Sequence, residues 1–289
     1  MTPPLAHRRR ALGAISVSGA DRQTFLQGQL TQDARGLRAG EARRMAGLTA
    51  KGKLLYFGWL VGESERALLL VAEASREAAR AHLTRFAVFQ KVSVEDATDQ
   101  FAVWGLYGSA TPSLTLPPGA VLLPTEGEMS AGVLARATEA ARIEAALAAA
   151  GSRELSSDEA EVRRIEAGRP RFGIDADGSN LPDEVGLQSA ISTEKGCYVG
   201  QEVVARLRTY GKVSRRLVGF RFAQRPLARG TVFPDPQKPD RELGHVTSSA
   251  ASPRFGPIGL GFASRSVDEG ATLVAPGGGS ADVTPLPFA

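Results

Sequence analysis

The last third of the chain carries the pattern that most restricts its fold. From residue 212 to residue 289, short apolar runs are interrupted by glycine and proline. Short strands separated by turn residues are typical of a small antiparallel β-barrel or β-sandwich. We therefore expect an all-β region in this part of the chain.

The chain before residue 212 mixes helix and strand patterns. Asp21 followed by RQTFLQGQL indicates a capped short helix with apolar residues on one face. Residues 43–72 are expected to form two strands that meet at a turn around Glu63. Further helices are expected at residues 75–86, 134–150 and 156–168, further strands at 12–19, 88–98 and 101–108, and a proline-rich loop at 111–128. The expected fold class is therefore α+β.

Length and composition describe an ordinary globular protein with more than one core. The chain has 289 residues and a mass of 30.5 kDa, with 43% hydrophobic and 23% charged residues, so two or three domains are expected. No apolar run approaches the roughly 20 residues that span a bilayer, so no membrane partner is expected. Three consecutive arginines near the start are typical of transit peptides, but the strand pattern at 12–19 favours mature protein.

The charge balance is basic without being concentrated anywhere. The formal net charge is +4 and the pI is near 9.4, which would suit an anionic ligand or RNA. No arginine-rich tract or glycine-aromatic motif gathers this charge. We therefore expect a solvated basic surface and no direct nucleic-acid binding.

Several kinds of chemistry are excluded by residue counts and spacing. The three histidines lie far apart, and no zinc pattern, Walker loop, GxGxxG or GxSxG motif occurs. The single cysteine excludes an intramolecular disulfide and cannot hold an iron–sulfur cluster within one chain. It fits a reducing compartment, so we expect a bacterial cytoplasmic protein that binds no metal by itself.

Residues 163–192 combine a helix stop with many turn formers and carboxylates. A calcium loop is one interpretation, although the DxD fragment lacks the full EF-hand spacing. Turn capping explains Asp175, Asp177 and Asp183 well. Glu184 is the better functional candidate, because a carboxylate after Pro-Asp and before an apolar turn suits paired hydrogen bonds from an amino-heterocycle such as a pterin.

The segment KGCYVGQEVVAR holds the only cysteine, Cys197. Glycines on both sides favour an exposed turn, and Lys195 would stabilise a thiolate if its ammonium lay nearby. The alternative is a small buried apolar residue, which is how an isolated cysteine usually behaves. Tyr198 and Gln201 are expected to pack or hydrogen-bond in the same turn, and Glu202 and Arg206 are candidates for an ion pair.

These two segments carry a resemblance to a known family. EAGRPRFGIDADGSNLPDEVGL resembles a stretch shared by glycine-cleavage T-proteins (aminomethyltransferases) and their relatives, and KGCYVGQE resembles the signature of one branch, the YgfZ-type folate-binding proteins. GADRQTFLQGQLTQD and LGHVTSSAASPRFGPIGLGF are similar to the entry motif and the C-terminal barrel of these families. The likeness spans nearly the whole chain.

The resemblance implies a T-protein-like ring of three domains around a channel. A discontinuous N-terminal folate-binding domain would cover residues 1–48 and 151–211, a ferredoxin-like α+β domain would be inserted at 49–150, and an antiparallel β-barrel would cover 212–289. The monomer is the default oligomeric state.

The resemblance also implies a cofactor and site residues. Tetrahydrofolate or a derivative would bind non-covalently in the channel. The residues implied as its ligands are Glu184, Arg206, Tyr198 and Gln201. Cys197, with Lys195 beside it, would serve the synthesis or repair of iron–sulfur enzymes, including one that thiolates tRNA, through transient contacts with client or assembly proteins.

One departure from the T-protein pattern separates the two branches. Aminomethyltransferases carry an acidic pair where this chain has Tyr56 and Phe57, and no acid occurs between Glu41 and Glu63. Transfer of a one-carbon unit needs a carboxylate to activate the folate nitrogen. Iron–sulfur support is therefore the leading hypothesis, a folate-dependent aminomethyltransferase or other one-carbon transferase is the second, and a scaffold with an inert thiol is the third.

Overall fold

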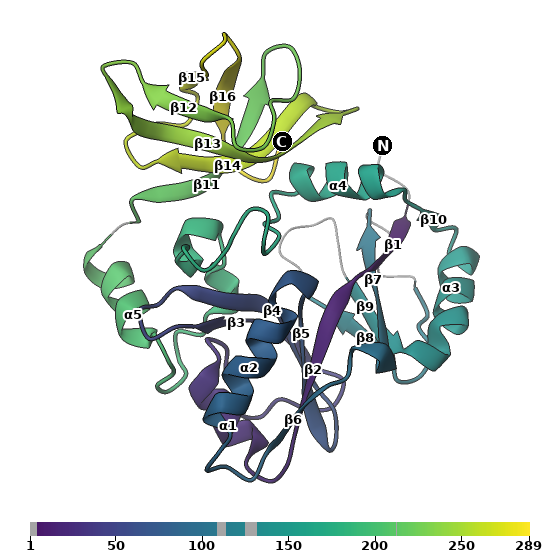
Figure 1. Cartoon of the computed structure of the whole chain (residues 1–289). Coiled ribbons are helices and arrows are strands. Elements are labelled where there is room, and N and C mark those ends of the chain that lie inside the picture. Colours follow the sequence, from purple (N-terminus) through teal and green to yellow (C-terminus); the bar gives the residue numbers. More distant parts are fainter. Residues whose placement is uncertain (1–4, 109–113, 125–131, 212) are drawn as a thin grey trace. The chain divides into compact units, whose positions relative to one another are not determined.

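A computed structural model describes residues 5–108, 114–124, 132–211 and 213–289. The chain forms two compact units (Figure 1). The first unit comprises residues 1–156 and 188–204, and the second comprises residues 157–187 and 205–289. Each unit is therefore built from two separate stretches of the chain.

The first unit contains a five-stranded antiparallel sheet in the order β3-β4-β5-β2-β6. Strands β4 and β5 are nearly continuous apolar runs, and the buried side chains of the sheet form one core with the helix that follows β5. The strands are β2 (Leu12–Ser18), β3 (Ala42–Leu48), β4 (Leu54–Gly62), β5 (Arg66–Ala72) and β6 (Ser93–Asp96).

A second sheet in the same unit has the order β10-β1-β7-β9-β8, with only the β1–β10 pair parallel. Trp59 and Leu70 of the first sheet share a buried cluster with Val103 and Leu134 of the second, so the two sheets pack into one unit. The strands are β1 (Ala6–Arg10), β7 (Phe101–Tyr107), β8 (Val121–Leu123), β9 (Gly132–Arg136) and β10 (Arg153–Glu154).

Helices cover these sheets through short apolar faces. Ala79 and Leu83 of α2 pack into the first core, and Ile143 and Leu147 of α3 pack beside Trp104 of the second sheet. The helices of this unit are α1 (Arg22–Gln29), α2 (Arg76–Phe86) and α3 (Ala140–Ala149), with the 3-10 helices η1 (Glu73–Ser75), η2 (Thr98–Gln100), η4 (Ala137–Glu139) and η6 (Gln188–Ala190). Helix α5 (Gln201–Tyr210) begins in the first unit and ends in the second.

The second unit holds α4 (Ser157–Glu166), the 3-10 helix η5 (Pro182–Val185) and a six-stranded antiparallel sheet. The sheet has the order β12-β13-β14-β11-β16-β15, and its edge strands β12 and β15 approach each other, so it is nearly closed around Phe220, Phe233 and Val246. The strands are β11 (Arg215–Phe222), β12 (Val232–Asp235), β13 (Lys238–Ser252), β14 (Gly256–Ser264), β15 (Thr272–Val274) and β16 (Ser280–Thr284).

The expected α+β class and the C-terminal barrel are confirmed, while several local predictions are wrong. The strand expected over 88–98 covers only Ser93–Asp96, because the chain before it forms a turn closed by the Gln90 N–H and the Ala87 carbonyl. Asp21 makes no side-chain hydrogen bond that caps α1. The helix expected over 134–150 begins only at Ala140, because Leu134 pairs with Val103 as part of β9. Residues 43–72 hold three strands, because a turn closed by the Gly52 N–H and the Thr49 carbonyl separates β3 from β4. Part of the proline-rich loop expected at 111–128 lies outside the described residues.

The three-domain division stays a prediction. Its boundary after residue 48 falls between β3 and β4, which pair in one sheet. Its boundary at residue 212 lies close to the start of β11 at Arg215.

Candidate functional site

Cys197 lies on an anchored, exposed loop of the first unit. Its side chain is exposed, as the flanking glycines predict. The Ser192 N–H donates to the Thr31 carbonyl before it, and the Val199 N–H donates to the Gly28 carbonyl after it. Both ends of the loop are therefore tied to α1 and the residues that follow that helix.

Gly200 ends this loop where the backbone must come close to the β3–β4 turn. Its φ is +83°, and a Cβ at this position would lie 2.5 Å from the Thr49 carbonyl oxygen. Only glycine combines this left-handed conformation with such a close approach. The glycine after Cys197 therefore fixes where the loop rests on the sheet.

The Lys195 ammonium points into the protein and caps α1. Its Nζ donates to the carbonyl oxygens of Gln27, Leu30 and Gln32 at 2.6, 2.5 and 3.2 Å. The last carbonyls of a helix lack partners within the helix, so a cation there is favourable. Burial lowers the pKa of Lys195 to about 8. These contacts give Lys195 a role in holding the loop, and its support of a Cys197 thiolate stays a prediction.

The other candidates near Cys197 have distinct positions. The Tyr198 ring is buried with the Lys195 ammonium 4.9 Å from its centroid, and its backbone N–H donates to Gln201 Oε1 at the start of α5. Arg206 is exposed further along α5 and, within the described ranges, forms no ion pair with a glutamate. The structure thus brings Lys195, Tyr198 and Gln201 together around one turn.

Glu184 lies in the second unit on η5, which begins at Pro182 and is capped after Val185 by Gly186 with φ +74°. Only 5% of Glu184 is exposed. Its Oε2 accepts hydrogen bonds from the Leu181 N–H at 3.1 Å and from Asn180 Nδ2 at 3.2 Å. Among the described residues nothing donates to its Oε1. The carboxylate is held in place by one oxygen and retains acceptor capacity on the other.

Two arginines that sequence reasoning missed lie beside the carboxylates of η5, one at Glu184 and the other at Asp183. Arg215 Nε is 3.6 Å from Glu184 Oε2, and its guanidinium stacks on the Phe262 ring with 4.8 Å to the centroid. Arg208 forms an ion pair with Asp183 at 3.2 Å, whose Oδ2 is buried and has no partner within the described ranges. No sequence signal joins these residues, because they lie more than 20 positions apart along the chain.

The aspartates of the preceding loop are structural, as turn capping predicts. Asp175 is 1% exposed and accepts hydrogen bonds from the hydroxyls of Thr247 and Ser248, both at 2.6 Å. It also pairs with Arg164 at 2.6 Å. Asp177 accepts the Ser179 N–H at 2.7 Å, and this bonding to Ser179 lowers the pKa of Asp177.

The position where the resemblance to aminomethyltransferases leads us to expect acids is occupied by core residues. Tyr56 is fully buried, and its hydroxyl lies 2.9 Å from His82 Nδ1. Phe57 is 8% exposed. Burial raises the pKa of the Tyr56 phenol, so this side chain stays neutral. It provides no carboxylate.

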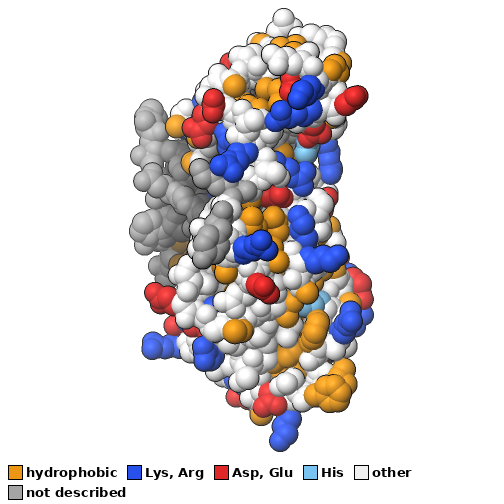
Figure 2. Space-filling view, turned by 90° about the vertical axis from the view of Figure 1, so that its left-hand side faces the viewer, with side chains coloured by type: hydrophobic (Ala, Val, Ile, Leu, Met, Phe, Trp, Pro, Cys, Tyr) orange, Lys and Arg blue, Asp and Glu red, His pale blue; other side chains and the backbone are white. Residues whose placement is uncertain are grey.

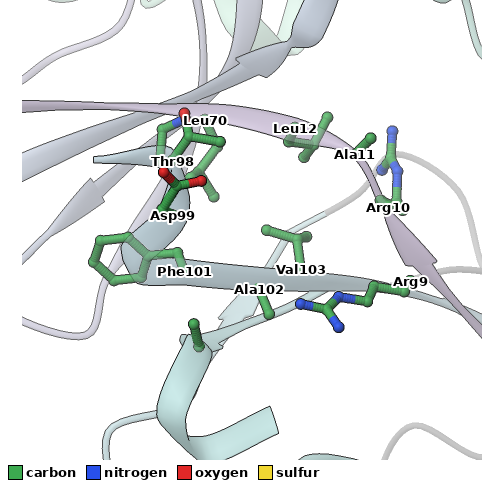
Figure 3. A pocket seen from close by; sticks show the side chains of 12 residues that line it. Arg9, Arg10, Ala11, Leu12, Leu70, Thr98, Asp99, Phe101, Ala102 and Val103 are labelled. Atoms are coloured by element: carbon green, nitrogen blue, oxygen red, sulfur yellow. The ribbon is translucent and has the colours of Figure 1, made fainter. Parts of the chain in front are cut away.

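A pocket of about 290 Å³ opens on the first unit. Figure 3 shows Arg9 and Arg10 at one end, Thr98 and Asp99 at the other, and Val103 on the strand between them. The Thr98 hydroxyl donates to Asp96 and accepts from the Ala14 N–H. Binding sites usually aim several polar groups at one point, whereas the charges here sit at opposite ends, so we assign no ligand to this pocket.

Within the part of the chain that the structure describes, no group of three His, Cys, Asp or Glu residues is placed to hold a metal ion. No helix among the described residues is long and apolar enough to cross a bilayer.

Comparison with known proteins assigns the chain to a family. No protein-family model matches it. It is 31% identical over 222 residues to the tRNA-modifying protein YgfZ of Colwellia psychrerythraea, covering 71% of this chain and 68% of that protein. It is 33% identical over 232 residues to that of Edwardsiella ictaluri, covering 72% and 68%. The chain belongs to the YgfZ family. The resemblance based on KGCYVGQE is thereby confirmed.

The YgfZ-family chain is also similar to aminomethyltransferases. It is 28% identical over 303 residues to the aminomethyltransferase of Rubrobacter xylanophilus, covering 96% of this chain and 81% of that protein. The crystal structure of the glycine cleavage system aminomethyltransferase T from Bartonella henselae matches with a TM-score of 0.83 at 21% identity, covering 99% and 86%. The T-protein-like fold is confirmed.

Proposed function

We propose that this chain binds tetrahydrofolate or a derivative and supports the synthesis or repair of iron–sulfur enzymes, including ones that thiolate tRNA. The observation that carries the proposal is the KGCYVGQE segment, which forms a loop with an exposed Cys197 and a Lys195 ammonium that ties it to α1. The names of the YgfZ relatives support a role in tRNA modification.

The acceptor geometry of Glu184 supports folate binding. A pterin presents a ring N–H beside an exocyclic amine, and a carboxylate accepts such a pair of donors. Glu184 is suited to this because its Oε2 is already held by Asn180 and Leu181 while its Oε1 retains acceptor capacity. Tyr198, Gln201 and Arg206 stay proposed as further folate ligands. When bound, the folate would supply one-carbon chemistry or a structural element, and this chain's residues would hold and orient it.

Cys197 is the proposed reactive group. An exposed thiol on a fixed loop can meet the surface of a partner without any rearrangement of the core. The client or assembly protein would hold the iron–sulfur cluster, and contact with it would be transient. The bacterial cytoplasm is the proposed location, because a lone thiol persists in reducing surroundings.

The second candidate function is an aminomethyltransferase or other folate-dependent one-carbon transferase. The similarity to the Rubrobacter protein across 96% of this chain favours it. The absence of any acid between Glu41 and Glu63, with Tyr56 in the core, argues against it. Release of a one-carbon unit from an aminomethyl donor by the purified chain would establish the transferase.

The main test is complementation of a knockout strain under oxidative stress. Wild type, Cys197→Ala and the exposed neighbour Glu194→Gln are expressed at equal levels, and thiolated tRNA nucleosides are measured by mass spectrometry. We expect Cys197→Ala to lower thiolation severalfold and Glu194→Gln to leave it unchanged. Full thiolation with Cys197→Ala would support a scaffold with an inert thiol.

Folate binding is tested separately by calorimetry with tetrahydrofolate. We expect the wild type to bind and Glu184→Gln to lose at least about tenfold in affinity, because the amide replaces one acceptor by a donor. Asp177→Asn, an exposed residue of the same loop, serves as the matched control. If the wild type does not bind, both folate functions fail, while the tRNA measurement still reports on Cys197.

A further inference from the structure

Three large apolar side chains are exposed at the end of α2 and on the turn that follows it. Phe86 is 43% exposed, Val88 71% and Phe89 96%. We call residues 85–91 the Phe89 tip. Figure 2 shows that hydrophobic side chains gather near the lower end of the view, with Lys and Arg side chains close by. Single exposed apolar residues are common, but a cluster with two aromatic rings marks an interaction surface.

The tip has a defined backbone geometry. The Gln90 N–H donates to the Ala87 carbonyl at 2.9 Å, and the Lys91 N–H donates to Asp21 Oδ2 at 2.8 Å. Asp21 was expected to cap α1, and its carboxylate instead holds the tip. Because these hydrogen bonds already hold the turn in one conformation, little conformational entropy is lost from the turn when a partner binds the rings.

The core does not account for the apolar residues of the tip. Ala87 and Val92 pack against the buried cluster of the first sheet and anchor the turn from both sides. Val88 and Phe89 contribute nothing to that cluster and extend outward. Folding would be served equally well by polar residues at these two positions.

The surroundings of the tip are positively charged. Arg85 lies 5.9 Å from the Phe86 ring centroid, and within the described ranges neither Arg85 nor Lys91 forms an ion pair. Arg22, next to Asp21, donates to the backbone carbonyls of Gly19 and Ser64 and so keeps its net charge. Asp21 is the acid bonded to this turn. The tip and the adjoining residues 21 and 22 thus carry three cations and one anion, a net positive charge beside the exposed apolar side chains.

We propose that the Phe89 tip is a docking site for a protein whose surface presents acidic residues around a small apolar hollow. Aromatic residues and arginine are enriched in protein–protein interfaces and at their binding hot spots. The proposal rests on the tip alone and is independent of folate and of Cys197.

Two other occupants fit the charges less well. In a symmetric dimer through this turn, Arg85 and Lys91 would face their own copies, which repel. Anionic membranes are recognised by clusters of about four to eight basic residues, whereas this tip has two and Arg22 adds a third. An acidic protein is therefore the occupant that the charge pattern favours.

The first experiment maps the contact in living cells of the source species. A photoreactive phenylalanine analogue replaces Phe89 in the full chain, and Val274, which is 57% exposed on β15, is the control position. We expect an adduct with an acidic protein at position 89 that is absent at position 274. The proposal would be overturned if adducts formed only with a second copy of the chain or only with lipid. It would also be overturned if adducts formed equally at both positions or did not form at all.

The second experiment measures affinity with the purified adduct partner. We expect Phe89→Ser and the double variant Arg85→Glu/Lys91→Glu each to weaken binding at least about tenfold, and Val274→Ser to leave it unchanged. The affinity should also fall at high ionic strength, because exposed charges are screened. Since position 89 is exposed, thermal unfolding of Phe89→Ser should match the wild type. An unchanged affinity of Phe89→Ser would overturn the proposal.

Discussion

Lys195 Nζ donates to the Gln27 carbonyl at 2.6 Å and so joins the Cys197 loop to a helix 168 residues earlier in the chain. The same ammonium also satisfies the carbonyls of Leu30 and Gln32. Replacing it with methionine leaves these buried acceptors without a donor. We expect Lys195→Met to lower the free energy of unfolding by about 1–3 kcal/mol, measured by urea denaturation.

The exposed Lys51→Met is the matched control for this prediction, because its side chain lies on the β3–β4 turn in solvent. We expect its unfolding free energy to change by less than about 0.5 kcal/mol. If both lysine variants behaved alike, the anchoring role of Lys195 would be disproved. A loss of tRNA thiolation in Lys195→Met with intact stability would instead indicate that the amine acts on the thiol.

Gly200 should tolerate no side chain. A Cβ there would lie 2.5 Å from the Thr49 carbonyl oxygen, and φ is +83°. We expect Gly200→Ala to lower the unfolding free energy by about 2 kcal/mol or more. Gly28→Ala is the control, since nothing lies within 4 Å of its Cβ position. Alanine within a helix should leave stability equal or raise it by up to about 1 kcal/mol. Equal effects of the two substitutions would contradict the close-approach account.

Local sequence patterns predicted the features that neighbouring residues determine. They did not predict the features that depend on contacts between residues far apart in the chain. Leu134 and Ala135 belong to an alanine-rich run that favours helix, yet pairing with β7 makes them strand. Exposure of Cys197 follows from its flanking glycines. The acceptors of Lys195 lie more than 160 residues away, so no spacing rule could have found them.

Glu184 shows the same division. Its hydrogen bonds to Asn180 and Leu181 are local and follow from the Pro-Asp-Glu turn, whereas the approach of Arg215 depends on where β11 begins. A candidate carboxylate could therefore be predicted, but its charged neighbours could not.

Asp175 joins the loop before Glu184 to β13. It accepts from Thr247 and Ser248 and balances the buried charge of Arg164. Asparagine would remove one of the two carboxylates that pair with Arg164, the other being Glu161 at 2.7 Å, so we expect Asp175→Asn to lower the unfolding free energy by about 2–3 kcal/mol. Asp177→Asn, which is exposed and can still cap Ser179, should change it by less than about 1 kcal/mol. Similar unfolding midpoints in urea for the two variants would refute the role of Asp175.

His82 makes stability depend on pH. Its Nδ1 faces the Tyr56 hydroxyl at 2.9 Å, and its Nε2 is buried with no partner among the described residues. Burial, with a smaller effect of Arg85, lowers the pKa of His82 from 6.5 to about 4. Between these values the unfolded chain binds more protons than the folded one, so stability is present above the unfolded pKa and is lost as the pH falls towards 4.

We therefore expect the wild type to lose about 2 kcal/mol more than His82→Gln when unfolding free energies at about pH 7 and about pH 4.5 are compared. Comparing the two proteins cancels the contribution of the carboxylates. Phe89→Ser is the control, because this exposed substitution removes no titratable group and should keep the wild-type pH dependence. The same loss in wild type and His82→Gln would show that His82 is not the group that titrates.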